Sequence, residues 1–226
     1  MQSSLLHASR LNGETPTRRW LPTPSDSPCS LNVAVPNQLL WAFIGLLLTI
    51  GGTFLEAHFT SSPWNWNHDG VQAFDIGVTY QVGAVLLVGC LGGKNAGAIS
   101  QIAYLVLGLT WLPIFAQGGG LEYLKQPYFG YVLGFIPGAW ICGWLAFKAH
   151  PKLESLAISC ICGLFAIHIT GLIYLVSSYI FSWMNPQTLS IFQTALKYSV
   201  YPLPGQLIVV CAVTVLAYCL RHLMFY

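Results

Sequence analysis

The sequence predicts an all-α, polytopic membrane protein with six transmembrane helices and both termini in the cytosol. Only 7% of the 226 residues are charged and 55% are apolar, whereas a soluble domain carries about 25% charged residues. Long stretches without Asp, Glu, Lys or Arg recur along the chain, and a helix needs roughly 20 apolar residues to cross a bilayer. Apolar runs such as LLWAFIGLLLTI do not alternate in polarity, which argues against a membrane β-barrel.

The expected spans follow the charge-free stretches in order. Helices are expected because hydrocarbon offers no hydrogen-bond partner to an open backbone. They are predicted at residues 37–57, 76–93, 95–117, 128–148, 154–183 and 202–224, all within one domain of residues 36–226.

Residues 1–35 differ in composition from the rest of the chain. Thirteen of the first thirty residues are Ser, Thr or Pro. No apolar run interrupts them, so a secretory signal peptide is not indicated. We interpret this segment as a disordered cytosolic tail. Arg10, Arg18 and Arg19 outnumber Glu14 and Asp26, so an organellar transit peptide is the alternative.

The orientation follows from the excess of Lys and Arg on the cytosolic side of membrane proteins. With a cytosolic N-terminus, only Lys125 and Lys197 lie outside, and the other seven Lys and Arg residues lie inside. Two cytosolic termini require an even number of spans, which agrees with six. A tight hairpin at 92–97 and a short connection at 148–154 are expected inside. The connections expected outside, 61–75, 116–127 and 184–202, are longer, so we expect a site that faces outward.

Groups that could support catalysis or bind a cofactor are few. GCLGGKN at 89–95 lacks the first Gly and the Ser or Thr of a phosphate-binding loop. No acid–base pair or nucleophile arrangement is present, so no catalytic residue, cofactor or enzyme activity is predicted. The net charge of +2 gives no indication of nucleic-acid binding.

The cysteines and His168 are the remaining reactive groups in the spans. Six of the seven Cys fall in apolar stretches, where we interpret them as small buried residues rather than disulfides. Cys160 and Cys162 lie two residues apart on a helix and point to different faces, so no metal site is predicted. His168 either bonds to a neighbouring helix or contacts a ligand.

Residues 110–135 are the most informative stretch. Pro113 should bend or end the third span. The glycines at 118–120 allow positive φ, and the N–H groups of such a loop can bind a small polar ligand. Tyr123, Tyr128 and Tyr131 add aromatic surface with polar ends. The alternative is an interfacial turn followed by an aromatic belt.

The order of motifs between Gly77 and Gly143 resembles the BioY family, the biotin-binding S components of energy-coupling-factor (ECF) transporters. Thr79 and Gln81 match positions of that family's Pro-Val-Thr-Leu-Gln segment. The matching motifs, in order, are GVTYQVGAVLLVG (77–89), SQIAYLVLG (100–108), LPIFAQGGG (112–120) and P-x-x-GYxxGF (127–135).

The resemblance implies a receptor for biotin in the bacterial plasma membrane. Two ATPase subunits and a transmembrane coupling protein would supply the energy, and this chain needs no cofactor of its own. The small residues Ala42, Gly45, Gly51 and Gly52 on the first span would pack against the coupling protein. The implied substrate-binding residues are Thr79, Gln81, Gln117, Gly118, Gly119, Gly120, Tyr123, Tyr131, His168 and Gln206.

The chain departs from the family pattern at the start of the last span. Gln206 and Val209 replace an acid and a lysine that many members carry there. A carboxylate ligand would then depend on neutral donors, or on Lys125 and Lys197 reaching inward. Two alternatives stay open: an S component for another small ligand, and a membrane scaffold or assembly protein that keeps the fold without capturing a ligand.

Overall fold

The computed structural model describes residues 35–60, 73–110, 112–116, 118–149, 152–181 and 190–225. All of these lie in one compact unit, Val33–Tyr226. The expected tail at 1–35, apart from its last residue, and Gln117 lie outside the described residues. In chain order the elements are α1 (Val35–Phe54), β1 (Glu56–Thr60), β2 (Ala73–Thr79), α3 (Gln81–Thr110), η2 (Leu121–Lys125), α4 (Phe129–Leu133), α5 (Phe135–Ala146), α6 (Leu153–Ile180), α7 (Ile191–Ala195), η3 (Leu196–Val200) and α8 (Leu203–Phe225).

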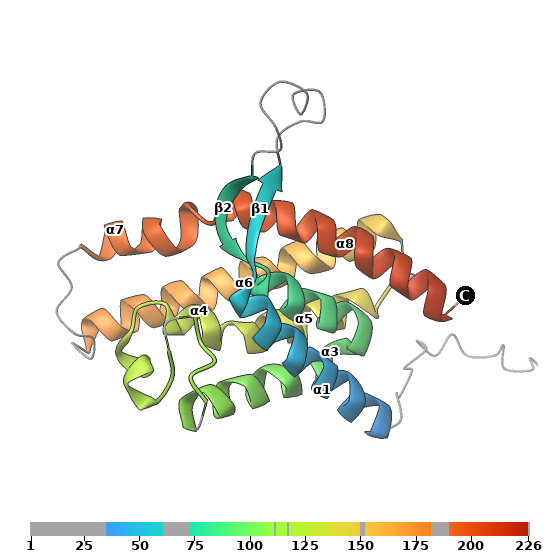
Figure 1. Ribbon diagram of the computed structural model, residues 1–226, viewed down its shortest axis with the longest axis horizontal. Coiled ribbons are helices and arrows are strands. Elements are labelled where there is room, and N and C mark those ends of the chain that lie inside the picture. The colour runs from blue at the N-terminus through green and yellow to red at the C-terminus, as the bar shows by residue number, and fades with distance from the viewer. Residues whose placement is uncertain are drawn as a thin grey trace, which may run out of the picture. The chain divides into compact units, whose positions relative to one another are not determined.

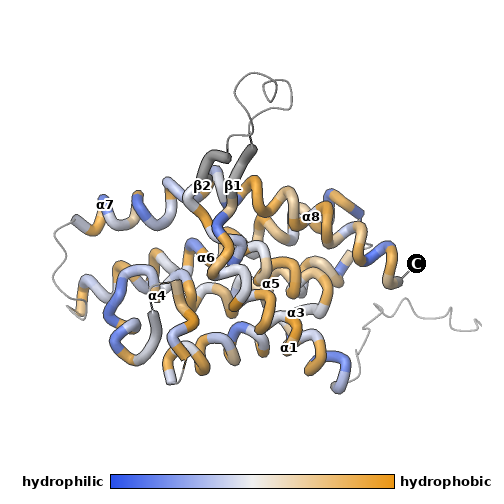
Figure 2. Tube along the Cα trace, viewed as in Figure 1, coloured by the Kyte–Doolittle hydropathy of each residue, from blue (hydrophilic) through white to orange (hydrophobic). Residues whose placement is uncertain are grey.

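The predicted helical class is confirmed, and the helices suit a bilayer. Among the described residues, five helical stretches are long and apolar enough to cross a membrane: Pro36–Phe54, Gln81–Thr110, Phe129–Ala146, Leu153–Ile180 and Ile191–Met224. Apolar residues predominate along these helices (Figure 2), and many of their bulky apolar side chains are exposed. Leu39 and Phe43, for example, are 57% and 59% exposed. Apolar surface of this extent needs a lipid environment, so the chain is a multi-pass membrane protein.

Helix α3 is broken at Gly93. The backbone there has φ 80° and ψ 178°, a region that essentially only glycine enters. A Cβ atom at Gly97 would lie 3.4 Å from the Cα of Gly89, although eight residues of continuous helix span about 12 Å. The chain therefore reverses direction at Gly93, and α3 is a hairpin of two helices (Figure 1). This is the tight connection expected at 92–97.

A small sheet was not expected from the sequence. Strand β1 pairs antiparallel with β2, with Glu56 opposite Thr79 and His58 opposite Asp75. The second span, expected from residue 76, therefore begins only at Gln81, because residues 76–79 form strand. A run without charges shows that a segment is apolar, but short apolar runs fit a strand as well as a helix.

Other span boundaries also differ from the expectation. The first span was expected to end at residue 57 and the third at residue 117, but α1 ends at Phe54 and α3 ends at Thr110. The early end of α3 agrees with Pro113, which cannot continue a helix. Ser190, whose side chain accepts from the Gln193 N–H, caps α7, and the helix runs on through η3 into α8.

The bundle is assembled around α3. Its two halves contact α1, α5, α6 and α8. Gly143 on α5 lies so near the hairpin that a Cβ atom there would be 2.5 Å from the Lys94 nitrogen. The residues of α1 that were expected to face a coupling protein mostly face this core instead. Ala42 is buried, and a Cβ atom at Gly45 or Gly52 would meet α3 or the residue before it; only Gly51 has open space around it.

Candidate ligand-binding site

A cavity of about 280 Å³ lies where β2, the start of α3, and the start of α8 meet α4. Ligand pockets usually measure about 300–1,000 Å³, so this one suits a small molecule. Its lining comes from segments far apart in the sequence. The lining residues are Gly77, Val78, Thr79, Gln81, Val82, Ala116, Tyr123, Tyr128, Tyr131, Val132, Phe135, Ile167, Tyr198, Pro202 and Gln206.

The amide of Gln81 is fixed at one wall of this cavity. Its Nε2 donates to the Tyr104 hydroxyl at 2.9 Å, and that hydroxyl donates to the Ile114 carbonyl at 3.1 Å. Tyr104 has no exposed surface, so its hydroxyl cannot exchange these hydrogen bonds for bonds to water, and the Gln81 amide keeps its orientation. Among the described residues, the side-chain amide oxygen of Gln81, Oε1, has no hydrogen-bond partner. That oxygen is therefore available to accept a hydrogen bond from a ligand N–H.

Gln206 presents the complementary group from α8. Its Oε1 lies 2.7 Å from Nε2 of His168 on α6. Because an amide oxygen can only accept, the His168 Nε2 carries the proton. Within the described part of the chain, the Nδ1 of His168 is buried without a partner, and none is recorded for the amide NH2 of Gln206. His168 thus bonds to a neighbouring helix, as one alternative predicted, and holds the side chain of Gln206, which lines the cavity.

Aromatic rings form a continuous wall between these two amides. The Tyr123 ring lies 4.4 Å from Phe115 and 4.8 Å from Tyr128, measured between centroids. The Tyr131 ring lies 6.2 Å from that of Tyr198. The Tyr131 hydroxyl is 2.6 Å from the Ser199 hydroxyl, which holds η3 against α4.

Two of the tyrosines that line the cavity, Tyr123 and Tyr128, stay neutral. Burial, followed by the nearby Tyr128 hydroxyl, raises the pKa of Tyr123 far above its ordinary value. Burial also raises the pKa of Tyr128. An unperturbed phenol titrates near pH 10, and a raised pKa keeps the proton in place beyond that. Both hydroxyls therefore remain hydrogen-bond donors at every physiological pH.

The glycine loop shapes the site without lining it. Phe115 and Gly118 exchange two backbone hydrogen bonds, of 2.9 and 3.0 Å, and the Gly120 N–H donates to the Gly108 carbonyl at 2.9 Å. Gly118 and Gly120 have φ values of 113° and 92°, which favour glycine. Folded onto the end of α3 in this way, the loop places Ala116 and Tyr123 at the cavity, and Phe115 packs behind the Tyr123 ring.

One cation lies beside the cavity. The Nζ of Lys197 sits 5.5 Å from the centroid of the Tyr198 ring, and Tyr198 is a lining residue. Lys197 itself is exposed. Its ammonium can therefore reach an anionic group at the cavity mouth while its charge stays in water.

The structure brings together half of the residues predicted to bind substrate. Thr79, Gln81, Tyr123, Tyr131 and Gln206 line the cavity, whereas His168 acts on it through Gln206. The predicted residues at 118–120 are not among the lining residues, and Gln117 lies outside the described residues.

Sequence reasoning did not name Tyr198, Phe135 or Ile167 as binding residues, although Phe135 ends the matching motif at 127–135. Phe135 and Ile167 look like ordinary core residues of apolar spans. Tyr198 lies in a stretch whose structure the sequence left open, so nothing in the sequence placed its ring beside Tyr131.

The model of the BioY family matches residues 37–225. An uncharacterized 21.2 kDa protein of Cyanophora paradoxa is 28% identical over 190 residues, which cover 82% of this chain and 95% of that protein. The probable biotin transporter BioY of Lysinibacillus sphaericus and the biotin transporter BioY of Thermotoga maritima are each 39% identical over 98 residues. Those alignments cover 43% of this chain and 50% and 57% of the two transporters.

A solved structure supports the fold assignment. The crystal structure of the S-component for biotin from an ECF-type ABC transporter superposes with a TM-score of 0.61. The superposition covers 83% of this chain and 92% of that one, at 20% sequence identity. Since the family model spans most of the sequence, and the fold agrees with it, this chain belongs to the BioY family.

Proposed function

We propose that this chain is the biotin-binding S component of an ECF-type importer, and that biotin occupies the cavity between Gln81 and Gln206. The observation that carries the proposal is the pair of oriented amides, one offering an acceptor and the other a donor, across a wall of tyrosine rings. The proposal assigns no enzymatic step to the chain, because its task is to bind the vitamin and move it inward.

The chemistry of biotin fits this lining. Its ureido ring is neutral and carries two N–H donors and one carbonyl acceptor, which the Gln81 oxygen and the Gln206 NH2 complement. Its apolar ring system can pack against Tyr123, Tyr131 and Tyr198. Its carboxylate would meet the tyrosine hydroxyls and the ammonium of Lys197 at the mouth. Charged residues inside the spans are therefore not needed, which accounts for Gln206 and Val209 in place of an acid and a lysine.

The energy for uptake would come from other subunits. We propose a transmembrane coupling protein and ATPase subunits as partners, because family membership implies them and this chain has no nucleotide-binding loop. The expected transport direction is inward, with biotin entering from outside.

We further propose six crossings with both termini in the cytosol. The break at Gly93 supports this count, because five apolar helical stretches become six if the two halves of α3 each cross the membrane. Lys94 and Lys148 lie over Trp140 and Trp144, at 5.9 and 4.9 Å from the ring centroids. Tryptophans with neighbouring lysines are typical of the cytosolic interface.

This topology can be tested in the bacterial plasma membrane, where we expect the protein to reside. Lys94→Cys and Lys125→Cys are introduced in a variant whose exposed Cys211 and Cys219 are Ser. A membrane-impermeant maleimide should label the cysteine at 125 on intact cells and the cysteine at 94 only after lysis. Labelling of both positions from outside would contradict six crossings.

If residues 1–35 are a transit peptide, the mature protein should start near residue 36 when its mass is measured.

Binding of biotin itself decides the function. The purified chain in detergent should bind labelled biotin with a dissociation constant below about 1 µM. Tyr123→Ala should weaken binding at least tenfold, because it removes a ring and a hydroxyl from the cavity wall. Tyr218→Ala is the matched control, since Tyr218 is exposed on α8 and is not a lining residue.

The alternative of a scaffold that no longer captures a ligand makes the opposite prediction. Micromolar or weaker binding, unchanged in Tyr123→Ala, would favour it. Tight binding of a different small acid with no affinity for biotin would favour the S component for another ligand.

A further inference from the structure

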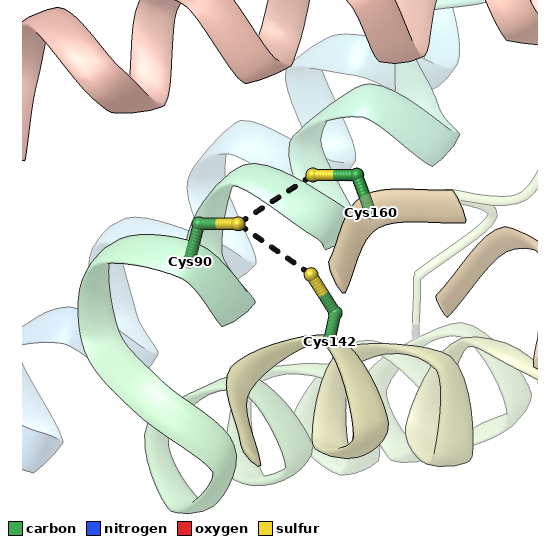
Figure 3. Close-up of side chains that lie close together, drawn as sticks. All are labelled: Cys90, Cys142 and Cys160. Carbon is green, nitrogen blue, oxygen red and sulfur yellow. Dashed lines mark hydrogen bonds between the residues drawn. The ribbon is translucent and has the colours of Figure 1, made fainter. Parts of the chain in front are cut away.

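Three buried cysteines from three different helices meet near the end of the bundle that carries Lys94 and Lys148. Cys90 lies on α3, Cys142 on α5 and Cys160 on α6, and none has any exposed surface. Figure 3 shows their side chains converging from the three helices. The Sγ of Cys90 lies 3.5 Å from that of Cys142 and 3.5 Å from that of Cys160, and all three sulfurs lie within 4.8 Å of one another.

These separations match a shared metal ion better than a disulfide. A disulfide requires sulfurs about 2.05 Å apart. A disulfide between two of these cysteines would also leave the third as a free thiol. A tetrahedral Zn²⁺ with Zn–S bonds of about 2.3 Å places its sulfur ligands about 3.8 Å apart. The observed 3.5 Å contacts need only small rotations of the side chains to reach that distance.

The surroundings offer a fourth ligand and a compensating charge. Thr214 on α8 is buried near Cys160, and its hydroxyl donates to the Val210 carbonyl at 2.8 Å, which leaves a lone pair on the oxygen for a fourth ligand bond. Arg221 is buried on α8, and its Nη1 donates to the Ala146 carbonyl at 2.7 Å, one helical turn beyond Cys142. Three thiolates and one Zn²⁺ carry a charge of −1, and the Arg221 guanidinium brings a positive charge to the same end of the bundle.

We propose that Cys90, Cys142 and Cys160 bind one thiophilic divalent cation, Zn²⁺, in a closed site that ties α3, α5 and α6 together. Binding is a simple exchange in which Zn²⁺ takes three thiolates as ligands and the three thiols release three protons. No electron is transferred. The site is structural, because its ligands are buried and none of them lines the biotin cavity.

The sequence alone did not indicate this site. Only Cys160 and Cys162 are near neighbours in the chain, and Cys162 is not part of the cluster. Cys90 lies 52 and 70 residues from the other two ligands, and Cys142 lies 18 residues from Cys160 along the sequence.

Metal content measures the proposal directly. The purified full chain, loaded with Zn²⁺ and desalted, should retain about one Zn²⁺ per chain by plasma mass spectrometry. Cd²⁺ should produce thiolate-to-metal charge-transfer absorbance. Cys90→Ser, Cys142→Ser and Cys160→Ser should each weaken Cd²⁺ binding at least tenfold. Cys211→Ser and Cys219→Ser are the controls, because both residues are exposed cysteines outside the cluster, and they should bind as the unmodified chain does.

A second measurement does not depend on the variants folding. X-ray absorption of the Zn-loaded chain should show about three sulfur ligands at about 2.3 Å. Absence of bound metal, oxygen and nitrogen ligands only, or undiminished uptake in all three cluster variants would overturn the proposal. So would a count of five instead of seven free thiols in the unfolded chain, because two of these cysteines would then form a disulfide.

Discussion

Replacing Gln206 with Leu should weaken biotin binding about 100-fold, which corresponds to about 2.7 kcal/mol. The substitution removes the amide NH2 of a lining residue and leaves the Nε2–H of His168 without its acceptor at 2.7 Å. A polar group of the ligand that is buried without its partner costs about 1–3 kcal/mol, whereas the unpaired His168 N–H lowers the stability of the free and the bound protein alike. Equilibrium binding of labelled biotin measures the loss, and thermal unfolding of the same sample shows whether the variant is folded.

Gln101→Leu provides the matched control for this experiment. Gln101 is a buried amide on α3 that does not line the cavity, and its Oε1 has no partner among the described residues. The same chemical change there should leave the affinity for biotin within about twofold. A folded Gln206→Leu protein with unchanged affinity would show that biotin does not bind at this amide.

Gly143→Ala should destabilise the bundle by ~3 kcal/mol. The added methyl would lie 2.5 Å from the Lys94 nitrogen and 2.6 Å from the Gly93 carbonyl carbon. Both are backbone atoms of the α3 hairpin, so neither can rotate away as a flexible side chain would. We expect a fall in the unfolding temperature of the purified protein of several degrees or more, together with a lower yield of folded protein.

The control for this clash is Gly51→Ala on α1. A Cβ atom at Gly51 has no neighbour within 4 Å, and alanine favours a helix over glycine by roughly 0.5–1 kcal/mol. The control should be as stable as the unmodified chain or more so. If both variants unfolded at the same temperature, α5 and the hairpin would not pack as closely as the structure shows.

The membrane class and the helices were predictable because charge cannot be buried cheaply in hydrocarbon. The hairpin at 92–97 was also predictable, since adjacent glycines beside a lysine interrupt an apolar run. The strands before Gln81 were not predictable, because the residues at 76–80 are apolar in either structure. The prediction that Ala42, Gly45 and Gly52 on α1 face a coupling protein was also wrong. Small residues allow close packing against a helix of the same chain as well as against a partner.

Several residues that were predicted to bind substrate lie together in the structure, and their role stays a prediction. Gln81 was named from a motif that resembles the family, Tyr123 from the aromatic cluster and Gln206 as the replacement of an acid, and all three line the cavity. The role of the glycines at 118–120 differs from the expectation. Their positive φ values serve to fold the loop onto α3, and the groups facing the cavity are the side chains that the loop carries.

The sequence by itself determined that this chain lies in a membrane, that it is mostly helical, and which segment holds its aromatic site, because each of these depends on local composition. Only the tertiary structure decided that His168 holds Gln206 and that Tyr198 faces Tyr131. The tertiary structure alone also decided that the sulfurs of Cys90, Cys142 and Cys160 lie close together. Such contacts join helices that are distant in sequence, and they depend on how those helices rotate and pack, which no local pattern records.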